Sequence, residues 1–439
     1  MTAGQNEIGI IGGGISGLLA CKYTLSKGFN PIVFESRDEV GGVWTKTIRT
    51  TKLQTPKSVY QFSDFPWPPS VAQDFPTQNQ VFEYIQSYAR HHDLLKYVKL
   101  NSRVVRVSYE DGPSEEEMWK WTLWGGTGEP FGHKRKWNVF QCRTHEACAQ
   151  RFVHQVDFVT VRAEMYSDFP NIPEFPPEKG PEAFQGKVMH SMDYSSMDHA
   201  SAAKLIQGKR VAVVGFRKSS MDISMECSSA NGIEQPCTLL YRTEHWNMPD
   251  QSPWGVPLEY LSQNCFSQLL VHKPGEGILS SLVATFLSPL RWGISKFVES
   301  HVRKKLRLAK RVMVPNHSFS KPCSVATLPE GFFDRVDQGS IILKKAQRFS
   351  FCSQGVVVDG DTEPLKIDLL ILATGFRGMD KLKAAFISPA FRDLIDKEDT
   401  TRLPLYRYGT MISCARTWDG RLNERRVSSE KPYRPMDYA

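Results

Sequence analysis

The chain has 439 residues, a length that fits two or three domains and excludes a single ordinary one. A hydrophobic content of 41%, with 11% aromatic residues, supports large buried cores and excludes an intrinsically disordered chain. The net charge of +8 is modest and spread along the sequence, so it suits anionic small molecules and gives no case for nucleic-acid binding.

Cysteine usage bears on the compartment and on metal binding. Nine cysteines at irregular spacing, without a secretory leader, predict reduced thiols in an intracellular, cytoplasmic protein. Cys142, His145 and Cys148 resemble part of a metal cluster, but no second ligand pair with zinc spacing accompanies them. We therefore predict free thiols and no metal site.

The first predicted element is a strand over Ile8–Ile11 that breaks into Gly12-x-Gly14-x-x-Gly17 before a helix. In a dinucleotide-binding turn, the first glycine permits the tight turn, the second lets a pyrophosphate approach the backbone, and the third lets the helix pack on the strand. A second strand over residues 32–34 places Glu35 at its tip to accept hydrogen bonds from ribose hydroxyls, which favours FAD or NAD over a 2′-phosphorylated cofactor. The expected cofactor contacts are Gly12, Gly14, Ser16, Gly17 and Glu35.

The run Gly41-Gly42-Val43-Trp44 indicates FAD in this first site. Paired glycines let the chain pass close to a flavin, and Trp44 is placed to cover it, so Gly42, Val43 and Trp44 are further expected contacts. The alternative is a Gly-Gly turn beside a core tryptophan.

A second strand-then-glycine signal occurs at Val211–Gly215, followed by a predicted helix that contains Lys218 and Ser219. The next predicted strand, residues 238–241, ends at Arg242, where a guanidinium matches a 2′-phosphate and favours NADPH over NADH. We expect Gly215, Lys218, Ser219 and Arg242 to bind this cofactor; the alternative is that the basic residues are only surface residues. Arg217 replaces the middle glycine, so it either pairs with phosphate or weakens nucleotide binding.

The apolar stretch over residues 278–290 is shorter than the roughly 20 residues that span a bilayer, and serines and a proline interrupt it. It predicts a buried or substrate-lining helix and no transmembrane span. The basic run Arg303–Lys305 leaves open an interfacial contact, such as peripheral association with the endoplasmic reticulum membrane.

A buried strand is predicted over Leu365–Leu372, before the small-residue turn Ala373-Thr374-Gly375, which suits the mouth of a dinucleotide site through Thr374 and Gly375. The predicted fold class is α/β, with two Rossmann-like domains and the NADPH domain inserted in the FAD domain. The predicted boundaries are 1–168 for the first part of the FAD domain, 169–325 for the NADPH domain, 326–407 for the return segment, and 408–439 for a poorly ordered tail. A proline-rich connector over residues 170–177 supports the first boundary.

With these motifs placed, the chain resembles the flavin-containing monooxygenases, and in particular their plant members. The diagnostic stretch is Phe184-Gln185-Gly186-Lys187-Val188-Met189-His190-Ser191-Met192-Asp193-Tyr194, which fits the family signature Phe-x-Gly-x-x-x-His-x-x-x-aromatic. Baeyer–Villiger monooxygenases share the signature but usually follow the aromatic residue with Pro or Asp, whereas this chain has Ser195. That difference favours oxygenation of nitrogen or sulfur.

The resemblance implies that NADPH reduces FAD, that a C4a-hydroperoxyflavin forms with dioxygen, and that a small-molecule nucleophile takes the distal oxygen. It also implies that His190 and Tyr194 tie the two domains together and help to hold the nicotinamide cofactor. Gln54 stands near the place of a family asparagine that bonds the oxygenated flavin; the alternatives are a packing histidine at His190 and a plain surface or packing glutamine at Gln54.

Two regions depart from the family pattern. Arg162 and Glu164 stand at positions where relatives have a small residue and glycine. Only 63 residues follow Phe376, which is fewer than is usual in the family. We therefore expect a shortened, atypical C-terminus, and we keep two alternatives to a coupled monooxygenase: an NADPH oxidase that releases peroxide, and an inactive nucleotide-binding pseudoenzyme. The sequence carries no signal for the oligomeric state or the substrate.

Overall fold

A computed structural model describes residues 6–112, 114, 136–144, 150–162, 168–261, 266–272, 278–319, 326–389 and 391–392. The predictions for His145, Cys148, Glu164 and the tail 408–439 lie outside the described residues.

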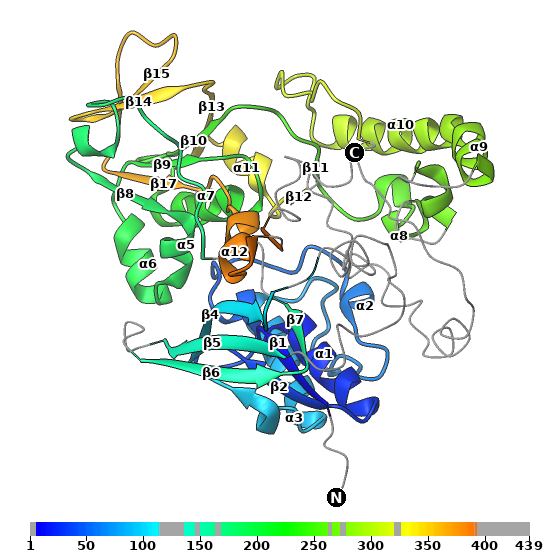
Figure 1. Cartoon of the computed structure of the whole chain (residues 1–439). Coiled ribbons are helices and arrows are strands. Elements are labelled where there is room, and N and C mark those ends of the chain that lie inside the picture. Colours follow the sequence, from blue (N-terminus) through cyan, green and yellow to red (C-terminus); the bar gives the residue numbers. More distant parts are fainter. Residues whose placement is uncertain are drawn as a thin grey trace, which may run out of the picture.

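The first body of the molecule is built on a four-stranded parallel sheet, drawn in blue to cyan-green in Figure 1. In this sheet β1 (Glu7–Ile11) lies between β2 (Asn30–Phe34) and β7 (Phe158–Val161), and the short β3 (Val98–Lys99) pairs with the other side of β2. The helix α1 (Ile15–Ser26) connects β1 to β2. Parallel strands joined by a crossover helix form the Rossmann arrangement that the glycine motif predicted.

Helix α3 (Gln78–His91) fills the core of this body. It begins at a capping box between Thr77 and Gln80, and its buried positions 81, 84, 85, 88 and 89 follow the helical period. The helix α2 (Lys57–Tyr60) adds Tyr60 to the same core. A three-stranded antiparallel sheet completes the body, with the order β4 (Ser102–Tyr109), β5 (Trp137–Arg143), β6 (Arg151–Val156).

The second body contains a five-stranded parallel sheet in the order β13-β10-β9-β17-β8. Its strands are β8 (Lys187–His190), β9 (Val211–Val214), β10 (Cys237–Tyr241), β13 (Ile341–Lys345) and β17 (Leu369–Leu372). The central strands are continuous apolar runs because helices and loops cover both faces of a parallel sheet.

Helices and two small sheets surround this second parallel sheet. The helices are α5 (Ser191–Ser196), α6 (His199–Ile206), α7 (Lys218–Asn231) and α11 (Phe332–Asp337). The antiparallel strands are β14 (Phe349–Cys352), β15 (Gly355–Val358) and β16 (Leu365–Lys366), and the strands of a short parallel pair are β11 (Asn247–Met248) and β12 (Ala326–Thr327).

Two connectors between the bodies run side by side. The Asn171 amide donates to the Gly375 carbonyl at 2.9 Å, and the Arg377 amide donates to the Phe169 carbonyl at 2.8 Å. After the second connector, α12 (Gly378–Ala385) returns the chain to the first body, where Phe386 forms a bridge with Val107 (Figure 1). The second body is therefore inserted in the first, as predicted.

The end of the insertion differs from the predicted position. The sequence analysis assigned residues 326–407 to the first domain, but β13 and β17 lie in the second sheet. The strand predicted over Leu365–Leu372 is also divided, because β16 belongs to the antiparallel sheet and β17 to the parallel one. Asp368 stands at the division, where its carboxylate accepts from the backbone amide and the guanidinium of Arg210. We propose that the inserted domain extends from residue 169 to about residue 373.

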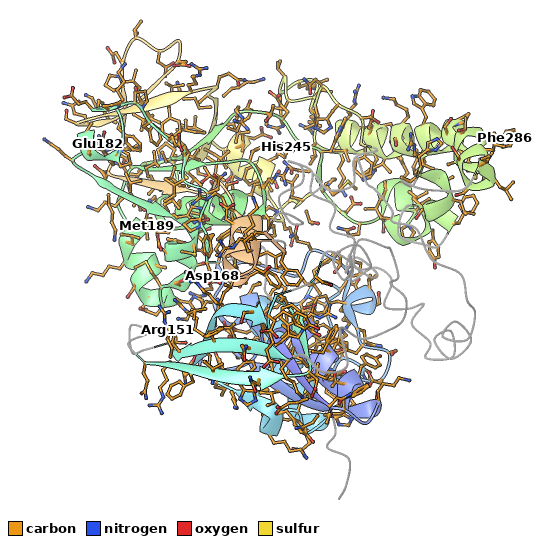
Figure 2. All side chains as sticks on the ribbon, in the orientation of Figure 1. Arg151, Asp168, Glu182, Met189, His245 and Phe286 are labelled. Atoms are coloured by element: carbon orange, nitrogen blue, oxygen red, sulfur yellow. The ribbon has the colours of Figure 1, made fainter. Side chains whose placement is uncertain are left out.

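Two helices form an arm beside the second body: α9 (Ile278–Phe286) and α10 (Ser288–Lys305). The helix α8 (Leu258–Leu261) lies near them, and Phe286 lies at the outer end of the arm (Figure 2). The sequence analysis expected a buried or substrate-lining helix here, but Ala284 is the only buried residue among those described in α9. The prediction of a buried helix is wrong, because apolar composition alone does not identify which surface covers a helix.

Cys21, Cys227, Cys237 and Cys352 have free thiols, as predicted, and the first three are buried. Cys142 is disulfide-bonded, which departs from the expectation that all cysteines are reduced. It lies near the end of β5, and irregular spacing along a sequence does not exclude the approach of two cysteines in a folded chain.

Candidate functional site

The first glycine turn joins β1 to α1 at the carboxyl edge of the first sheet. Gly12 has φ +105°, which a side chain would strain, and its amide donates to the Phe34 carbonyl at 2.9 Å. A Cβ on Gly17 would lie 1.8 Å from the Gly12 carbonyl oxygen, so only glycine lets α1 pack on the turn. Ser16 is exposed in the first turn of α1, whose amide end is available to an anion.

Glu35 stands immediately after β2 and is almost fully buried. Its Oε2 accepts from the Gly13 amide at 2.6 Å, and its Oε1 accepts from the Arg37 amide at 2.9 Å. Ser36 Oγ also donates to Oε1, at 3.2 Å. These bonds fix the carboxylate against the glycine turn, where Oε2 keeps a further lone pair for a ribose hydroxyl.

The second glycine motif packs directly on the first. A Cβ on Gly42 would lie 3.1 Å from the Gly14 Cα, and the Gly41 amide donates to the Gly13 carbonyl at 3.1 Å. Gly41 and Gly42 both have positive φ, at +141° and +60°. The glycines of both motifs thus form one side-chain-free cradle in which a flat, anionic cofactor has access to backbone amides.

Val43 and Trp44 follow in a short 3-10 helix, Gly42–Thr45, and both are half-buried. The Trp44 ring meets Tyr60 edge-on with centroids 6.5 Å apart, while its carbonyl accepts from Gln78 Nε2 at 2.6 Å. Trp44 therefore contacts the core, as in the alternative interpretation, and the expectation that it covers a flavin stays a prediction.

The second glycine turn lies at the carboxyl edge of β9. Gly215 has φ +131°, and a Cβ there would lie 2.5 Å from the Ala373 carbonyl oxygen, so the turn fits closely against the end of β17. Helix α7 begins at Lys218, and Ser219 is half-buried in its first turn. Lys218 Nζ donates to the buried carboxylate of Asp222 at 2.5 Å, so its charge is already compensated.

The free cationic groups at this turn are Arg217 and Arg242. Both side chains are exposed, and no salt bridge involves either of them within the described residues. Arg242 follows β10, the strand adjacent to β9, so both guanidinium groups stand at the same edge of the sheet. His245 lies close to them: burial lowers its pKa most, and the charge of Arg217 lowers it further (Figure 2). The arrangement is suited to a phosphate group.

His190 is buried at the end of β8 and caps α5 through Nδ1, which accepts from the Met192 amide at 3.1 Å. Its ring meets Phe376 edge-on with centroids 5.2 Å apart. Burial lowers the pKa of His190, and the nearby Gly375 backbone partly offsets that effect. The Gly375 turn, predicted from the sequence, thus lies beside this histidine.

Thr374 and Gly375 belong to the second connector. Thr374 Oγ1 donates to the Asn171 carbonyl, and Gly375 has φ +86°. Both residues therefore lie where the chain passes between the bodies, next to the end of β17.

Tyr194 is buried in α5 and donates to Glu226 Oε2 at 2.7 Å. The other oxygen of Glu226 accepts from the amide and the hydroxyl of Thr50, at 3.2 and 3.1 Å. One turn earlier in α7, Asp222 accepts from Thr51 Oγ1 at 2.6 Å. Helix α7 is thus bonded to residues 50–51 of the first body.

Gln54 is exposed and belongs to the same interface. Its Oε1 accepts from the Thr327 amide at 3.2 Å, and its carbonyl accepts from Gln251 Nε2 at 2.9 Å. The side chain therefore bonds to β12 of the second body, a packing contact that the sequence analysis named as its alternative.

Sequence analysis missed the carboxylates of Asp222 and Glu226, which make the contacts between the bodies. They are spaced four residues apart on α7, as are Lys218 and Asp222, so one helix face carries all three. That spacing is a signal the sequence does contain. Their partners carry no such signal, because Thr51 is 171 residues from Asp222 and Thr50 is 176 residues from Glu226.

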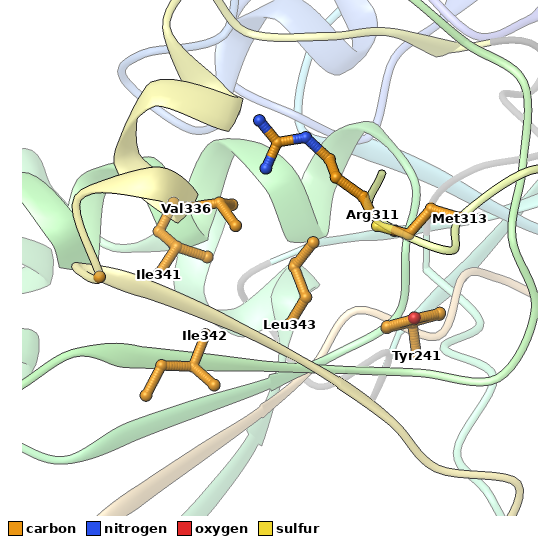
Figure 3. A pocket seen from close by; sticks show the side chains of 8 residues that line it. Tyr241, Arg311, Met313, Val336, Ile341, Ile342 and Leu343 are labelled. Atoms are coloured by element: carbon orange, nitrogen blue, oxygen red, sulfur yellow. The ribbon is translucent and has the colours of Figure 1, made fainter. Parts of the chain in front are cut away.

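One hollow in the described part of the chain lies away from both turns. An open depression of about 320 Å³ lies along the edge strand β13, lined by Leu343, Val336 and Arg311 among others (Figure 3). Arg311 is bound by both oxygens of Asp337, at 2.5 and 2.6 Å. None of the predicted site residues lines this depression, so we do not assign the reaction to it.

Two parallel sheets, each with a glycine turn at its carboxyl edge, define a protein with two dinucleotide-binding domains. The flavin-binding monooxygenase-like family matches residues 5–408. A probable flavin-containing monooxygenase 1 of Arabidopsis thaliana is 41% identical over 92% of this chain and 76% of its own length, and a putative flavin-containing monooxygenase 2 of the same plant is 37% identical over 92% and 78%. The chain therefore belongs to the flavin-binding monooxygenase-like family.

Solved structures agree on the fold. An oxidised steroid monooxygenase bound to NADP has a TM-score of 0.59 at 17% identity, covering 88% of this chain and 75% of its own. The enzyme OTEMO in complex with FAD and NADP has a TM-score of 0.57 at 18% identity, covering 88% and 74%.

Proposed function

We propose that the protein is an FAD- and NADPH-dependent monooxygenase that oxygenates nitrogen or sulfur in a small molecule. The observation that carries the proposal is a continuous set of contacts between the two glycine turns. Gly42 lies against Gly14. The side chain of Gln78 donates to the Trp44 carbonyl, and its backbone amide donates to the Thr51 carbonyl at 3.1 Å. Thr51 then bonds Asp222, the partner of Lys218.

The first cradle would hold FAD. Gly12, Gly14 and Gly17 leave the backbone open to a pyrophosphate, and Glu35 is fixed where a ribose would lie. Because a Cβ would fill the space between Gly14 and Gly42, the cradle fits a cofactor that contacts backbone rather than side chains.

The second turn would hold NADPH through the amides after Gly215 and the guanidinium of Arg242. A 2′-phosphate needs cationic donors, which Arg217 and Arg242 supply without breaking an ion pair to any described residue. Arg217, which replaces a glycine of the motif, would bind phosphate rather than obstruct it, because its side chain is exposed.

FAD, reduced by NADPH, supplies the chemistry that activates dioxygen. The chain contributes position and exclusion of water. His190 contacts Phe376 of the connector and would position that segment toward bound cofactors, and Tyr194 holds α7 against the first body through Glu226. Gln54 supplies an amide at the same interface.

Oxygenation of nitrogen or sulfur is favoured by Ser195, which follows the signature aromatic residue. A relative in rabbit named dimethylaniline monooxygenase [N-oxide-forming] 2 is 24% identical over 92% of this chain and 66% of its own length, which is consistent with an amine or thioether substrate.

The test is the visible absorption spectrum of the purified protein before and after NADPH is added in air, followed by product analysis with an amine and a thioether. We expect a flavin spectrum that bleaches with NADPH and an oxygenated product. Stoichiometric hydrogen peroxide without oxygenated product would instead identify an uncoupled oxidase. A colourless protein that cannot be loaded with FAD would identify a pseudoenzyme.

A further inference from the structure

The two glycine turns lie in different bodies of the molecule, and a short segment of the first body joins them. This segment begins at Trp44, soon after the paired glycines of the first cradle. It ends at Thr51, which bonds to α7, the helix that follows the second glycine turn. We call residues 44–51 the strap. The placement of one turn relative to the other therefore depends on how the strap is held at its two ends.

The far end of the strap is anchored in the second body. Ile48 is 5% exposed and belongs to the same core cluster as Val213 and Ile223 of that body. Thr50 and Thr51 each donate a side-chain hydroxyl to a carboxylate of α7, at 3.1 and 2.6 Å. One apolar side chain and two hydrogen bonds thus hold this end of the strap against the second body.

The partner of Thr51 is a buried carboxylate. Asp222 is 1% exposed, and its Oδ1 accepts from Lys218 Nζ at 2.5 Å while its Oδ2 accepts from the Thr51 hydroxyl at 2.6 Å. Lys218 is the first residue of α7, at the helix end where phosphates of a nicotinamide cofactor would bind. Hydrogen bonds to ionised groups are shorter and stronger than those between neutral groups. Asp222 therefore ties the start of α7 to the strap.

The near end of the strap is tied to the same threonine through Gln78. Gln78 is 7% exposed at the start of α3. Its backbone amide donates to the Thr51 carbonyl at 3.1 Å, and its side-chain amide donates to the Trp44 carbonyl at 2.6 Å. Thr51 thus contacts the second body through its hydroxyl and the cradle side through its carbonyl. Removal of the hydroxyl alone would break this path and leave the bonds on the cradle side in place.

We propose that Thr51 is a positioning residue for the transfer of a hydride from NADPH to FAD. The inference rests on the proposed function, which assigns these two cofactors to the two turns. A hydride carrying two electrons leaves NADPH, which becomes NADP+, and FAD takes up the hydride together with one proton from solvent. A misplacement of about 1 Å can slow a reaction on the order of a hundredfold. Loss of the bond from Thr51 to Asp222 should therefore lower the rate of flavin reduction rather than the affinity for the cofactor.

The experiment compares Thr51→Val, which keeps the shape of the side chain without its hydroxyl, with Thr51→Ser, which keeps the hydroxyl. Reduction of the flavin by saturating NADPH without oxygen is followed by the loss of visible absorbance. We expect a rate about tenfold lower in Thr51→Val and close to the parent's rate in Thr51→Ser. The Kd for NADP+, measured by calorimetry, should stay within about threefold in both variants. Dithionite, which needs no nicotinamide site, should reduce all three proteins equally.

Hydrogen–deuterium exchange of the cofactor-free protein tests the attachment of the strap directly. The amides of residues 44–54 should exchange faster in Thr51→Val than in the parent, and as in the parent in Thr51→Ser. Gln78→Met removes the bond to the Trp44 carbonyl and is the second variant, with the same slow reduction and unchanged NADP+ binding expected. If Thr51→Val does not fold, as judged by circular dichroism and urea unfolding, Gln78→Met decides the question.

Reduction at the parent's rate in Thr51→Val, or an equal loss of rate in Thr51→Ser, would overturn the inference alone. So would unchanged exchange of the strap in Thr51→Val, or a weaker binding of NADP+ that accounts for the whole loss. A parent protein whose bound flavin NADPH does not reduce, or which cannot be loaded with FAD, would overturn the proposed function and this inference with it. The behaviour of the parent thus distinguishes the two failures.

Discussion

At Gly17 the space for a side chain is smaller than at the other residues of the first turn. A Cβ would lie 1.8 Å from the Gly12 oxygen, a backbone atom that cannot move without opening the turn. Gly17→Ala should therefore destabilise the protein by more than about 3 kcal/mol and abolish FAD retention. Urea unfolding and flavin content after desalting measure both effects.

Gly293 provides the matched control for that substitution. It lies within α10, and no atom stands within 4 Å of an added Cβ. Gly293→Ala should be neutral or stabilise by up to about 1 kcal/mol, because alanine is the better helix former. Equal destabilisation by both substitutions would contradict the steric account of Gly17.

Replacing Arg242 should weaken NADPH binding, whereas replacing Lys218 should lower the stability of the fold. Arg242 is exposed and has no described ion pair, so Arg242→Ala should raise the KM for NADPH about tenfold to a hundredfold with little change in the use of NADH. Steady-state kinetics with the two nicotinamide cofactors measures this. An equal loss with both cofactors would argue against a 2′-phosphate contact.

Lys218→Ala should act mainly on stability. The substitution leaves the carboxylate of Asp222, which is 1% exposed, without its cation. We expect a loss of about 3 kcal/mol or more in the free energy of unfolding. A variant as stable as the parent, with NADPH binding lost, would show that Lys218 binds the cofactor instead.

At the scale of elements, the attachment of α7 to the first body is the feature most open to test. Tyr194 and Thr50 bond opposite oxygens of Glu226, so the two contacts share one carboxylate. Tyr194→Phe should cost about 1.5–3 kcal/mol, as expected for a buried hydrogen bond to a charged group. The double variant with Thr50→Ala should cost less than the sum of the two single changes. Strict additivity would mean that Glu226 does not couple the contacts of Tyr194 and Thr50.

The elements around the two turns could be predicted because their signals are local. A short apolar run that ends in glycine identifies β1 and β9, and the acid or base after the next strand identifies the place of Glu35 and Arg242. The division of residues 365–372 could not be predicted, because it depends on the bonds of Asp368 to Arg210, which is 158 residues away. The exposure of α9 was missed for a related reason: the sequence gives its apolar composition but not the surface that it faces.

The site could be predicted only in part for the same reason. The glycines of the cradle follow from spacing, whereas the close approach of Gly42 to Gly14 is visible only in the folded chain. The contacts that join the bodies involve Asp222, Glu226 and Thr51. Nothing in the sequence around these polar residues indicates that they contact one another in the folded chain. Gln54 was singled out by resemblance, and its bond to the Thr327 amide is a contact that only the folded chain defines.

For the whole molecule, stability should depend on pH through histidines that are buried or partly buried. Burial is the largest cause lowering the pKa of His92, His190 and His245. In the unfolded chain such a group titrates near pH 6.5, so below that pH the unfolded state binds more protons than the folded state. The folded state therefore keeps its full stability above about pH 6.5. It loses the part that depends on neutral histidines as the pH falls toward the pKa values that these histidines have in the folded state.

The ion pair of Arg210 with Asp368 affects stability in a separate pH range. Arg210 lowers the pKa of Asp368 to about 2, so the stabilisation from this pair is present above about pH 4 and is lost only below that. A decline in stability between pH 6.5 and 5 therefore does not report the Arg210–Asp368 pair.

We expect the urea midpoint to be level from pH 8 to 7 and to fall between pH 6.5 and 5, with a slope in the free energy of unfolding of at most about 1.4 kcal/mol per pH unit for each histidine. His190→Gln should reduce that slope, since glutamine cannot take up a proton on unfolding. His199→Gln, at an exposed position at the start of α6, is the control that should leave it unchanged. A midpoint that rises on acidification, or a slope unaffected by His190→Gln, would mean that burial does not keep this histidine neutral in the folded molecule.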